Sequence, residues 1–213
     1  MNRDLHSIRL DYQFEALLED SAGDDPLTFF DKWLKYAIEE GVADPTAMVI
    51  STVDARSQPH ARVVLLKHRD DSGFTFFTNY DSDKGHQLSL NNKASLTFFW
   101  SILSRQVRIE GTVEKVSKEV AETYFSSRPR ASQLAARTSK QSTVIKNRKE
   151  LQDSFKAEAE AFENQKVTCP ENWGGYRLQP NYIEFWQGRP SRLHDRLCFS
   201  KTNSHWTLER KAP

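Results

Sequence analysis

Residues 185–196, FWQGRPSRLHDR, combine cationic and aromatic side chains in one short stretch. If residues 192–197 form a strand, alternation places three of them on one face, namely Arg192, His194 and Arg196. Guanidinium groups form forked hydrogen bonds to phosphate or carboxylate and stack on flat rings. Such a row beside Trp186 suits an anionic, planar ligand. The alternative is a solvent-exposed strand face on which Asp195 pairs with an arginine.

Two further stretches carry positive charge. Arg62 and Lys67 lie at either end of an apolar run, and their opposite parity would aim them apart on a flat strand. Residues 128–149 contain seven basic residues and no acidic one, which taken alone is typical of a nucleic-acid patch. The segment lacks interleaved aromatic residues, however. Because basic groups, hydroxyls and a helix N-terminus also form phosphate sites, a small phosphate ligand is favoured over nucleic acid.

The composition limits the classes of protein to consider. The 213 residues carry a formal net charge of only +1, so bulk attraction to nucleic acid or to a membrane is not indicated. Cys169 and Cys198 match no metal-ligand spacing and are expected to be reduced thiols of a cytoplasmic protein. Residues 1–12 contain no apolar run typical of a signal peptide, and no segment approaches the roughly 18 apolar residues of a membrane span. We therefore expect no metal site, no membrane partner and no nucleic-acid partner.

One helix has both ends marked in the sequence. Asp25 is a favourable N-cap, Pro26 fits the first turn, and Gly41 fits just beyond the end. Apolar residues at helical spacing predict a buried face made of Leu27, Phe30, Leu34 and Ile38.

The remaining elements are mostly strands. Short β-branched or aromatic runs separated by turn residues predict strands within residues 47–54, 60–70, 74–79, 95–100, 105–116, 174–188, 192–199 and 205–210. A short helix is expected over residues 82–92, and two or three helices between 118 and 163, the last of them strongly charged and solvated on one face. This order favours an antiparallel barrel with helices outside.

The predicted organisation is one domain over residues 25–213, with helical insertions at about 117–166. Residues 1–24 are polar and show no clear periodicity, which is typical of a disordered tail.

Seven motifs make the chain resemble a known family. In order they are ADPTAMVISTVD followed by RVVLLKH, then FTNYDSDKGHQ, RQVRIEG, YFSSRPRASQ, SKQS, WGGYRLQPNYIEFWQG and RLHDR. Together they resemble the pyridoxine (pyridoxamine) 5′-phosphate oxidase family, from about Arg9 to the end of the chain. Each motif is weak alone, and the ordered set is specific.

The resemblance implies a mainly β fold with flanking helices, an antiparallel, Greek-key-like, FMN-binding split β-barrel. It implies a homodimer that holds FMN at the subunit interface. The implied activity is oxidation of pyridoxine 5′-phosphate or pyridoxamine 5′-phosphate to pyridoxal 5′-phosphate. A hydride passes to FMN, and molecular oxygen reoxidises the flavin with release of hydrogen peroxide. The protein would supply orientation and charge, since the redox chemistry belongs to the cofactor.

The resemblance also assigns site residues. Those expected at FMN are Arg62, Val63, Val64, Leu65, Leu66, Lys67, Phe77, Thr78, Lys84, Gln106, Gln141, Ser142, Trp186 and Arg196. Those expected at the substrate are Arg9, Tyr12, Lys67, Tyr124, Arg128, Ser132, Arg192 and His194. Among them, Arg192 and His194 would be catalytic and cover the pyridine ring. Arg9 and Tyr12 would belong to an N-terminal flap, which gives residues 1–24 a functional alternative to disorder.

Four positions depart from the family pattern, and they are Leu10, Asp83, Arg137 and Lys211. An arginine that grips the FMN phosphate is usual where Asp83 stands. Since Asp is favoured in the first turn of a helix, we expect its side chain to turn outward. Two alternatives remain open. One is a related split-barrel flavin oxidase acting on another ring, as in phenazine biosynthesis, and the other is a non-catalytic protein that binds FMN or pyridoxal phosphate.

Overall fold

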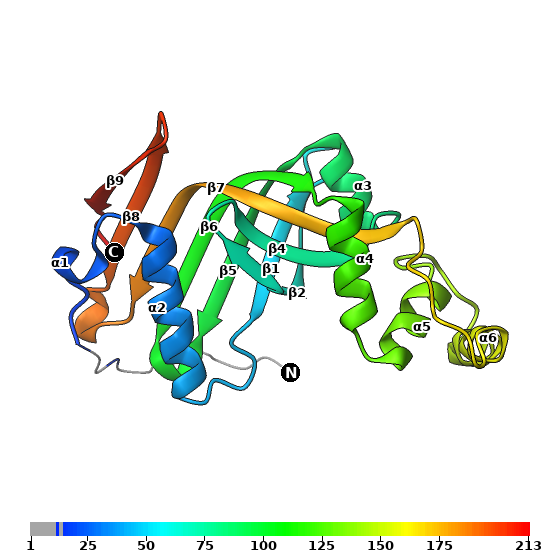
Figure 1. The fold of residues 1–213 in the computed structure, drawn as a ribbon. Coiled ribbons are helices and arrows are strands. Elements are labelled where there is room, and N and C mark those ends of the chain that lie inside the picture. Colours follow the sequence, from blue (N-terminus) through cyan, green and yellow to red (C-terminus); the bar gives the residue numbers. More distant parts are fainter. Residues whose placement is uncertain (1–11, 13–14) are drawn as a thin grey trace, which may run out of the picture. The chain divides into compact units, whose positions relative to one another are not determined.

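The computed structural model describes Tyr12 and residues 15–213 (Figure 1). Contacts between Cα atoms divide these residues into two compact units, which are described separately. The first unit contains the described residues up to Val49, together with Ser95–Glu110 and Pro180–Pro213. The second contains Ile50–Ala94 and Gly111–Gln179. The domain division expected from the sequence stays a prediction.

Within the described part of the chain, nine strands form one sheet. They are β1 (Ala47–Val53), β2 (Pro59–Leu65), β3 (His68–Asp70), β4 (Gly73–Asn79), β5 (Lys93–Trp100), β6 (Arg105–Lys115), β7 (Trp173–Gln187), β8 (Asp195–Thr202) and β9 (His205–Arg210). The order is β2-β1-β5-β6-β7-β4-β3, with β8 paired to β7 and β9 to β8. The pairs β3–β4, β4–β7, β7–β8 and β8–β9 are antiparallel. The predicted mainly β, antiparallel architecture is confirmed.

Among the described residues, two helices precede β1 and the others lie between strands. The helices are α1 (Glu19–Ala22), α2 (Pro26–Glu39), α3 (Asp83–Leu90), α4 (Lys118–Ser127), α5 (Arg130–Thr138) and α6 (Arg148–Ala161), with the 3-10 turns η1 (Ser101–Leu103) and η2 (Pro190–Arg192). The three helices α4–α6 confirm the prediction for residues 118–163, and α6 contains no buried residue, as its charge pattern indicated. No described helix is long and apolar enough to cross a membrane.

Helix α2 starts and ends as the sequence predicts, and its buried face is partly the predicted one. The Asp25 carboxylate accepts hydrogen bonds from two backbone N–H groups of the first turn, and Gly41 has a φ of 72°. Ile38, expected to be buried, is 56% exposed. Leu27 and Phe30 are buried as predicted, and the stripe continues through Phe29, Trp33 and Ala37 in place of Leu34 and Ile38. It is rotated toward the larger aromatic side chains, which remove more apolar area from water.

The aromatic residues of α2 form the core of the first unit. The Phe29 and Trp33 rings lie 4.5 and 5.2 Å from the Phe185 ring of β7. On the neighbouring side, the Phe30 ring lies 5.1 Å from that of Phe98 on β5. All five side chains are buried. Residues 15–24 belong to this unit, and there the Leu17 N–H donates to the carboxylate of Asp195.

The strand predicted at residues 192–197 is wrong in its first half. Residue Gln187 is the last of β7, and it pairs with Asp195, the first of β8. Residues 188–194 therefore connect two antiparallel strands and have no partner strand. In this connection Ser191 and Arg192 adopt left-handed backbone conformations, with φ of 56° and 61°. Strand alternation consequently does not apply to Arg192 and His194.

The second unit has its own core beside helices α4 and α5. Its buried residues are Phe125, Leu134, Val167 and Trp173. Phe155 and Ala159 of α6 pack against this core, and the Nε of Arg137 on α5 lies 2.5 Å from a carboxylate oxygen of Glu158 on α6. The same guanidinium lies 4.4 Å from the Phe162 ring centre. Because a guanidinium is planar and stacks on rings, Arg137 can pair with Glu158 and pack on Phe162 at the same time.

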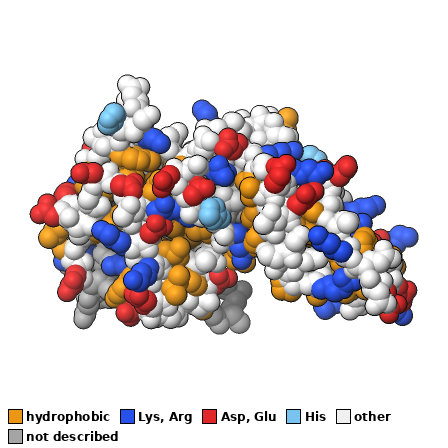
Figure 2. Space-filling view, in the orientation of Figure 1, with side chains coloured by type: hydrophobic (Ala, Val, Ile, Leu, Met, Phe, Trp, Pro, Cys, Tyr) orange, Lys and Arg blue, Asp and Glu red, His pale blue; other side chains and the backbone are white. Residues whose placement is uncertain are grey.

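Acidic and basic side chains are interspersed over the face shown in Figure 2. This pattern agrees with the net charge of +1. Opposite charges close together weaken the field at a distance. Any concentration of positive charge in this protein is therefore local, as in a cavity lined by cations.

Candidate functional site

A cavity of about 620 Å³ in the second unit gathers most of the predicted ligand-binding residues. Those predicted for FMN that line it are Arg62, Val63, Val64, Leu65, Lys67, Phe77, Thr78, Lys84 and Gln141. Of those predicted for the substrate phosphate, Lys67, Tyr124 and Arg128 line it. Four of these residues are cations, from β2, the segment that follows it, α3 and the end of α4. A cavity with four cations and several rings suits anionic ligands that carry a flat ring.

The convergence of Arg62 and Lys67 has a simple structural cause. Strand β2 ends at Leu65 and β3 begins at His68, so the chain is not one flat strand. Between them, the Lys67 N–H donates to the carbonyl oxygen of Thr75 on β4 at 2.9 Å. Because the strand breaks between them, Arg62 and Lys67 both line one cavity, although alternation along an unbroken strand would place them on opposite faces. Leu66 is 5% exposed and lies in the core, outside the lining.

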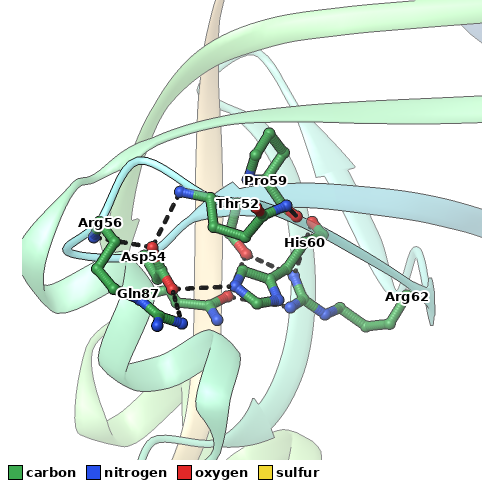
Figure 3. A network of polar contacts seen from close by, with 8 residues as sticks. Thr52, Asp54, Arg56, Pro59, His60, Arg62 and Gln87 are labelled. Atoms are coloured by element: carbon green, nitrogen blue, oxygen red, sulfur yellow. Dashed lines mark hydrogen bonds and ion pairs between the residues drawn. The ribbon is translucent and has the colours of Figure 1, made fainter.

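Arg62 is held from behind by two neutral side chains (Figure 3). Its Nη1 donates to the hydroxyl of Thr52 on β1, and its Nη2 donates to the amide oxygen of Gln87 on α3, at 2.5 and 3.0 Å. Burial lowers the pKa of Arg62, and the charge of Asp83 opposes this shift. The guanidinium remains charged, because arginine does not titrate in the physiological range.

Lys84 lies in the first turn of α3, where Ser82 is the N-cap. Its ammonium donates to the side-chain oxygens of Thr78, Ser82 and Gln141 at 3.0–3.1 Å. Burial, reinforced by the charge of Arg62, lowers its pKa from 10.5 to about 8. In the described part of the chain, no carboxylate lies within ion-pair distance of Lys84 or Arg62. Both cations are therefore oriented without being neutralised.

Helix α3 lies directly on the chain that precedes it. A Cβ placed on Gly85 would lie 1.9 Å from the carbonyl oxygen of Tyr80. No side chain fits there, so glycine permits the approach. Lys84 and Gln87 flank this residue, and their spacing places them on one face of the helix. The close contact between Gly85 and Tyr80 therefore fixes how far the side chains of Lys84 and Gln87 lie from the sheet.

The segment after α5 attaches to the same helix start. The Gln141 amide oxygen accepts from the Asn79 N–H as well as from Thr78 and Lys84. The Ser142 hydroxyl accepts from the backbone N–H of Asp83, the first residue of α3, at 3.2 Å. The Asp83 residue is exposed, as expected for that position. Residues far apart in the sequence thus meet at a helix N-terminus, where the helix dipole favours anions.

Stacked rings form another wall of the cavity. The rings of Phe77 and Tyr124 are 3.9 Å apart, and Trp173 is parallel to both. The Arg128 guanidinium lies 4.7 Å from the Trp173 ring. Its Nη1 is buried without a hydrogen-bond partner among the described residues, and burial lowers its pKa. A buried unpaired donor is costly, which favours an anion at this place. Ser132, in the first turn of α5, is half-buried and outside the lining.

The remaining predicted residues belong to the first unit. The His194 ring lies 4.8 Å from that of Trp186 and 5.6 Å from that of Tyr12. Its Nδ1 accepts from the Arg189 N–H at 3.0 Å, so the proton of the neutral ring is on Nε2. Arg192 is exposed. The predicted residue Arg9 lies outside the described residues.

Arg196, on β8, is held by a carboxylate. Its Nε and Nη2 each donate to one oxygen of Glu184 at 3.0 Å, and its Nη1 donates to the Ala212 carbonyl at 2.9 Å. Glu184 also accepts from the Tyr182 hydroxyl. Burial alone would raise the pKa of Glu184, but these hydrogen bonds hold it below its ordinary value. Gln106 is half-buried on β6.

Three residues that orient these arginines were missed by sequence reasoning, and they are Thr52, Gln87 and Glu184. Thr52 and Glu184 both lie inside the quoted motifs, but nothing in the sequence marks either as the partner of an arginine, because each meets its arginine only across the folded sheet. Gln87 does carry a signal, since it follows Lys84 by three positions on a predicted helix.

Comparison with known proteins identifies related chains. The family model described as pyridoxamine 5′-phosphate oxidase matches residues 34–161, and that described as pyridoxine 5′-phosphate oxidase C-terminal dimerisation region matches residues 173–213. Pyridoxine/pyridoxamine 5′-phosphate oxidase 1 of Hydrogenovibrio crunogenus is 49% identical over 100% of this chain and 99% of its own. The corresponding oxidase of Pseudomonas fluorescens is also 49% identical, over the whole of both chains.

Solved structures establish the fold. PhzG from Burkholderia lata, in complex with tetrahydrophenazine-1-carboxylic acid, has a TM-score of 0.87 at 24% identity, over 93% of this chain and 98% of its own. A pyridoxamine 5′-phosphate oxidase-related, FMN-binding protein from Nostoc punctiforme has a TM-score of 0.70 at 14% identity, over 86% and 97%. The split β-barrel predicted from the sequence is confirmed.

Proposed function

The chain belongs to the pyridoxamine 5′-phosphate oxidase family, and on this premise we propose which residues hold its cofactor and substrate. The protein is an FMN-dependent oxidase that converts pyridoxine 5′-phosphate and pyridoxamine 5′-phosphate to pyridoxal 5′-phosphate. Both FMN and the substrate carry a phosphate dianion and a flat ring. The observation that carries the assignment is the cavity of the second unit, with its four cations and its stacked rings.

The FMN phosphate is held by Arg62 and Lys84, with the Ser142 hydroxyl at the start of α3. Support comes from the neutral partners of both cations, which leave their charge uncovered. The N-terminus of α3 adds its dipole to the same place. Gln141 and Thr78 fix the Lys84 ammonium, while Val63, Val64, Leu65 and Phe77 provide apolar lining.

The substrate phosphate is held by Lys67, Tyr124 and Arg128. The buried and unpartnered Nη1 of Arg128 supports this role, because a phosphate oxygen would satisfy it. Ser132 lies four residues after Arg128, in the first turn of α5, where its hydroxyl can join the same anion. Tyr124, Arg128 and Ser132 lie in or at the ends of helices α4 and α5, which hold them rigidly. Lys67 lies in the short connection between β2 and β3, where its backbone N–H is bonded to Thr75 of β4.

For residues of the first unit, the family resemblance implies contacts with the rings of the flavin and the substrate. Bound FMN supplies the acceptor for the two electrons removed at the 4′ carbon of the substrate. His194 offers an Nε2–H donor because its Nδ1 is occupied by the Arg189 N–H. Arg192, held in a left-handed turn, offers a guanidinium that can cover the pyridine ring, and Tyr12 belongs to the flap over it. By the family resemblance, Trp186, Arg196 and Gln106 would contact the flavin or its ribityl chain.

We also propose a homodimer and molecular oxygen as the terminal electron acceptor. The match of residues 173–213 to a dimerisation region supports the first. An isologous dimer is the commonest arrangement among soluble homo-oligomers.

A flavin oxidase acting on another ring is disfavoured by the 49% identity to full-length relatives named as pyridoxine/pyridoxamine 5′-phosphate oxidases.

The colour of the flavin tests the alternative of a non-catalytic protein that only binds FMN or pyridoxal phosphate. The purified protein should be yellow, bleach under anaerobic pyridoxine 5′-phosphate, and recover its colour in air. A yellow protein that does not bleach would be a binder, and a colourless protein that takes up no FMN would contradict the cofactor assignment.

A further inference from the structure

Three side chains behind the cavity form a closed ring of hydrogen bonds (Figure 3). Arg62 donates to Thr52 from Nη1 and to Gln87 from Nη2. The Thr52 hydroxyl in turn donates to the same amide oxygen of Gln87. The three residues come from β1, β2 and α3, so the ring ties one arginine to two strands and a helix.

The donor and the acceptor of each hydrogen bond in the ring are fixed. The single hydroxyl proton of Thr52 is used toward Gln87, so a lone pair faces Arg62. The amide oxygen of Gln87 accepts two donors, which fixes its orientation. Thr52 is 1% and Gln87 7% exposed, so water competes little for these bonds.

The hairpin that carries two members of the ring is also fixed. The Asp54 carboxylate accepts from the backbone N–H groups of Arg56 and Gln58 at 2.8 and 2.9 Å, which closes the turn between β1 and β2. Its backbone N–H donates to the Gln58 carbonyl. Asp54 also lies 3.4 Å from the His60 ring nitrogen (Figure 3). The turn therefore holds Thr52 and Arg62 at a constant separation.

Both acceptors in the ring are uncharged, and this decides what the arginine can do. A carboxylate in place of the Gln87 amide would form a charge-assisted pair with Arg62 and cover its charge. It would also bring a negative charge close to the bound phosphate. An amide and a hydroxyl set the direction of the guanidinium and leave its full charge for an anion in the cavity.

We infer that Thr52 and Gln87 are positioning residues that hold Arg62 for the FMN phosphate, and that the neutrality of Gln87 is required for this role. The inference rests on the proposed function, since it takes the anion at Arg62 to be the phosphate of FMN. Neither residue needs to contact the flavin itself.

The test compares FMN with riboflavin, which lacks the phosphate. Both ligands are titrated by flavin fluorescence into protein freed of its cofactor. Gln87→Glu keeps the shape of the side chain and adds one charge, so FMN affinity should fall about tenfold or more, while riboflavin affinity changes less than about twofold. Gln152→Glu on the exposed face of α6 is the matched control for charge, and it should leave both affinities unchanged.

A second pair of variants tests the hydroxyl. Thr52→Val keeps the shape and removes the hydrogen bonds, so FMN affinity should fall about tenfold. Thr52→Ser keeps the hydroxyl, so its FMN affinity should be within about threefold of that of the natural protein. Thermal unfolding and riboflavin binding show whether each variant is folded.

The outcomes separate the inference from the proposed function. If the natural protein binds FMN more tightly than riboflavin, but Gln87→Glu and Thr52→Val keep the same preference, the inference is wrong and the cofactor site stands. Equal losses for both flavins in a folded variant also contradict it. If the natural protein binds no FMN, the proposed function itself fails.

Discussion

Two arginines assigned to the flavin are held in opposite ways. Arg62, in the second unit, has the neutral oxygens of Thr52 and Gln87 as partners. Arg196, in the first unit, is held by both carboxylate oxygens of Glu184. A neutral partner fixes direction and leaves charge available, whereas a carboxylate fixes direction and covers the charge. The first arrangement suits a phosphate dianion, and the second suits uncharged parts of a ligand.

The partners also differ in what they contribute to stability. Glu184 is buried, and its carboxylate would be costly there without the hydrogen bonds from Arg196 and Tyr182. The Thr52–Gln87 pair carries no net charge and therefore needs no such compensation. Substitutions at Arg62 should consequently show in cofactor affinity, and those at Glu184 should show in the free energy of unfolding.

The largest effect is expected for Arg62→Met, which removes the charge but keeps much of the apolar stem. FMN affinity should fall about a hundredfold, because a buried charge pair with the phosphate is lost. Fluorescence titration measures this loss, and riboflavin should bind as before. An equal loss for riboflavin would mean that Arg62 supports the fold of the site rather than the phosphate.

The next effect concerns Glu184→Gln, which makes the setting of Arg196 resemble that of Arg62. Removing one charge of a largely buried pair should lower the free energy of unfolding by about 2 kcal/mol, discounted because the arginine is partly exposed. Chemical denaturation of the FMN-loaded and FMN-free proteins measures it. The double variant Glu184→Gln with Arg196→Met is the control, and it should recover part of the loss. Unchanged stability in the single variant would break the comparison.

The pH dependence of FMN binding should follow Lys84, whose pKa is lowered by burial to about 8. The phosphate favours the protonated amine, and the dianion itself is fully formed above its second pKa of about 6. FMN affinity should therefore fall as the pH rises from 7 to 9, by at most about tenfold per unit. Titrations at several pH values should show the change for FMN and none for riboflavin. Lys84→Arg should remove it, and a profile that stays pH-dependent would contradict the assignment.

The same lowered pKa predicts how stability changes without FMN. Between about 8 and the ordinary value of 10.5, the unfolded chain keeps a proton that the folded chain has lost. Stability should therefore rise with pH across this window, since the unfolded state binds more protons. Denaturation at pH 8 and pH 10, compared with Lys84→Met as a control, isolates this contribution.

The smallest effect is expected for Asp83→Arg. Asp83 is exposed in the first turn of α3, and its charge opposes the lowering of the pKa of Arg62 and Lys84. Replacing it with a cation should tighten FMN binding several-fold, with the larger gain at low salt. Titration at two salt concentrations measures this. Unchanged or weaker binding would show that this position does not face the phosphate.

Local rules predicted much of the fold. The caps at Asp25 and Gly41 marked the ends of α2, and apolar runs marked most strands. The cations that line the cavity were also predicted, because the ordered set of motifs that carries them is specific. The break after Leu65 and the loop at residues 188–194 were not predictable, since each depends on which strand provides the partner. Pairing at long range also brings Glu184 to Arg196, and no local pattern encodes it.

The glycine in helix α3 limits how the protein can change over evolutionary time. Because residue 85 presses against the backbone of Tyr80, a side chain there would lift the whole helix. Lys84 and Gln87 would move together, and no single later substitution could return both. Drift can alter the exposed positions of α3, such as Asp83 and His86, one at a time. The buried face of the helix is inherited as a unit with Gly85, so lineages should differ at the outer positions long before they differ at the inner ones.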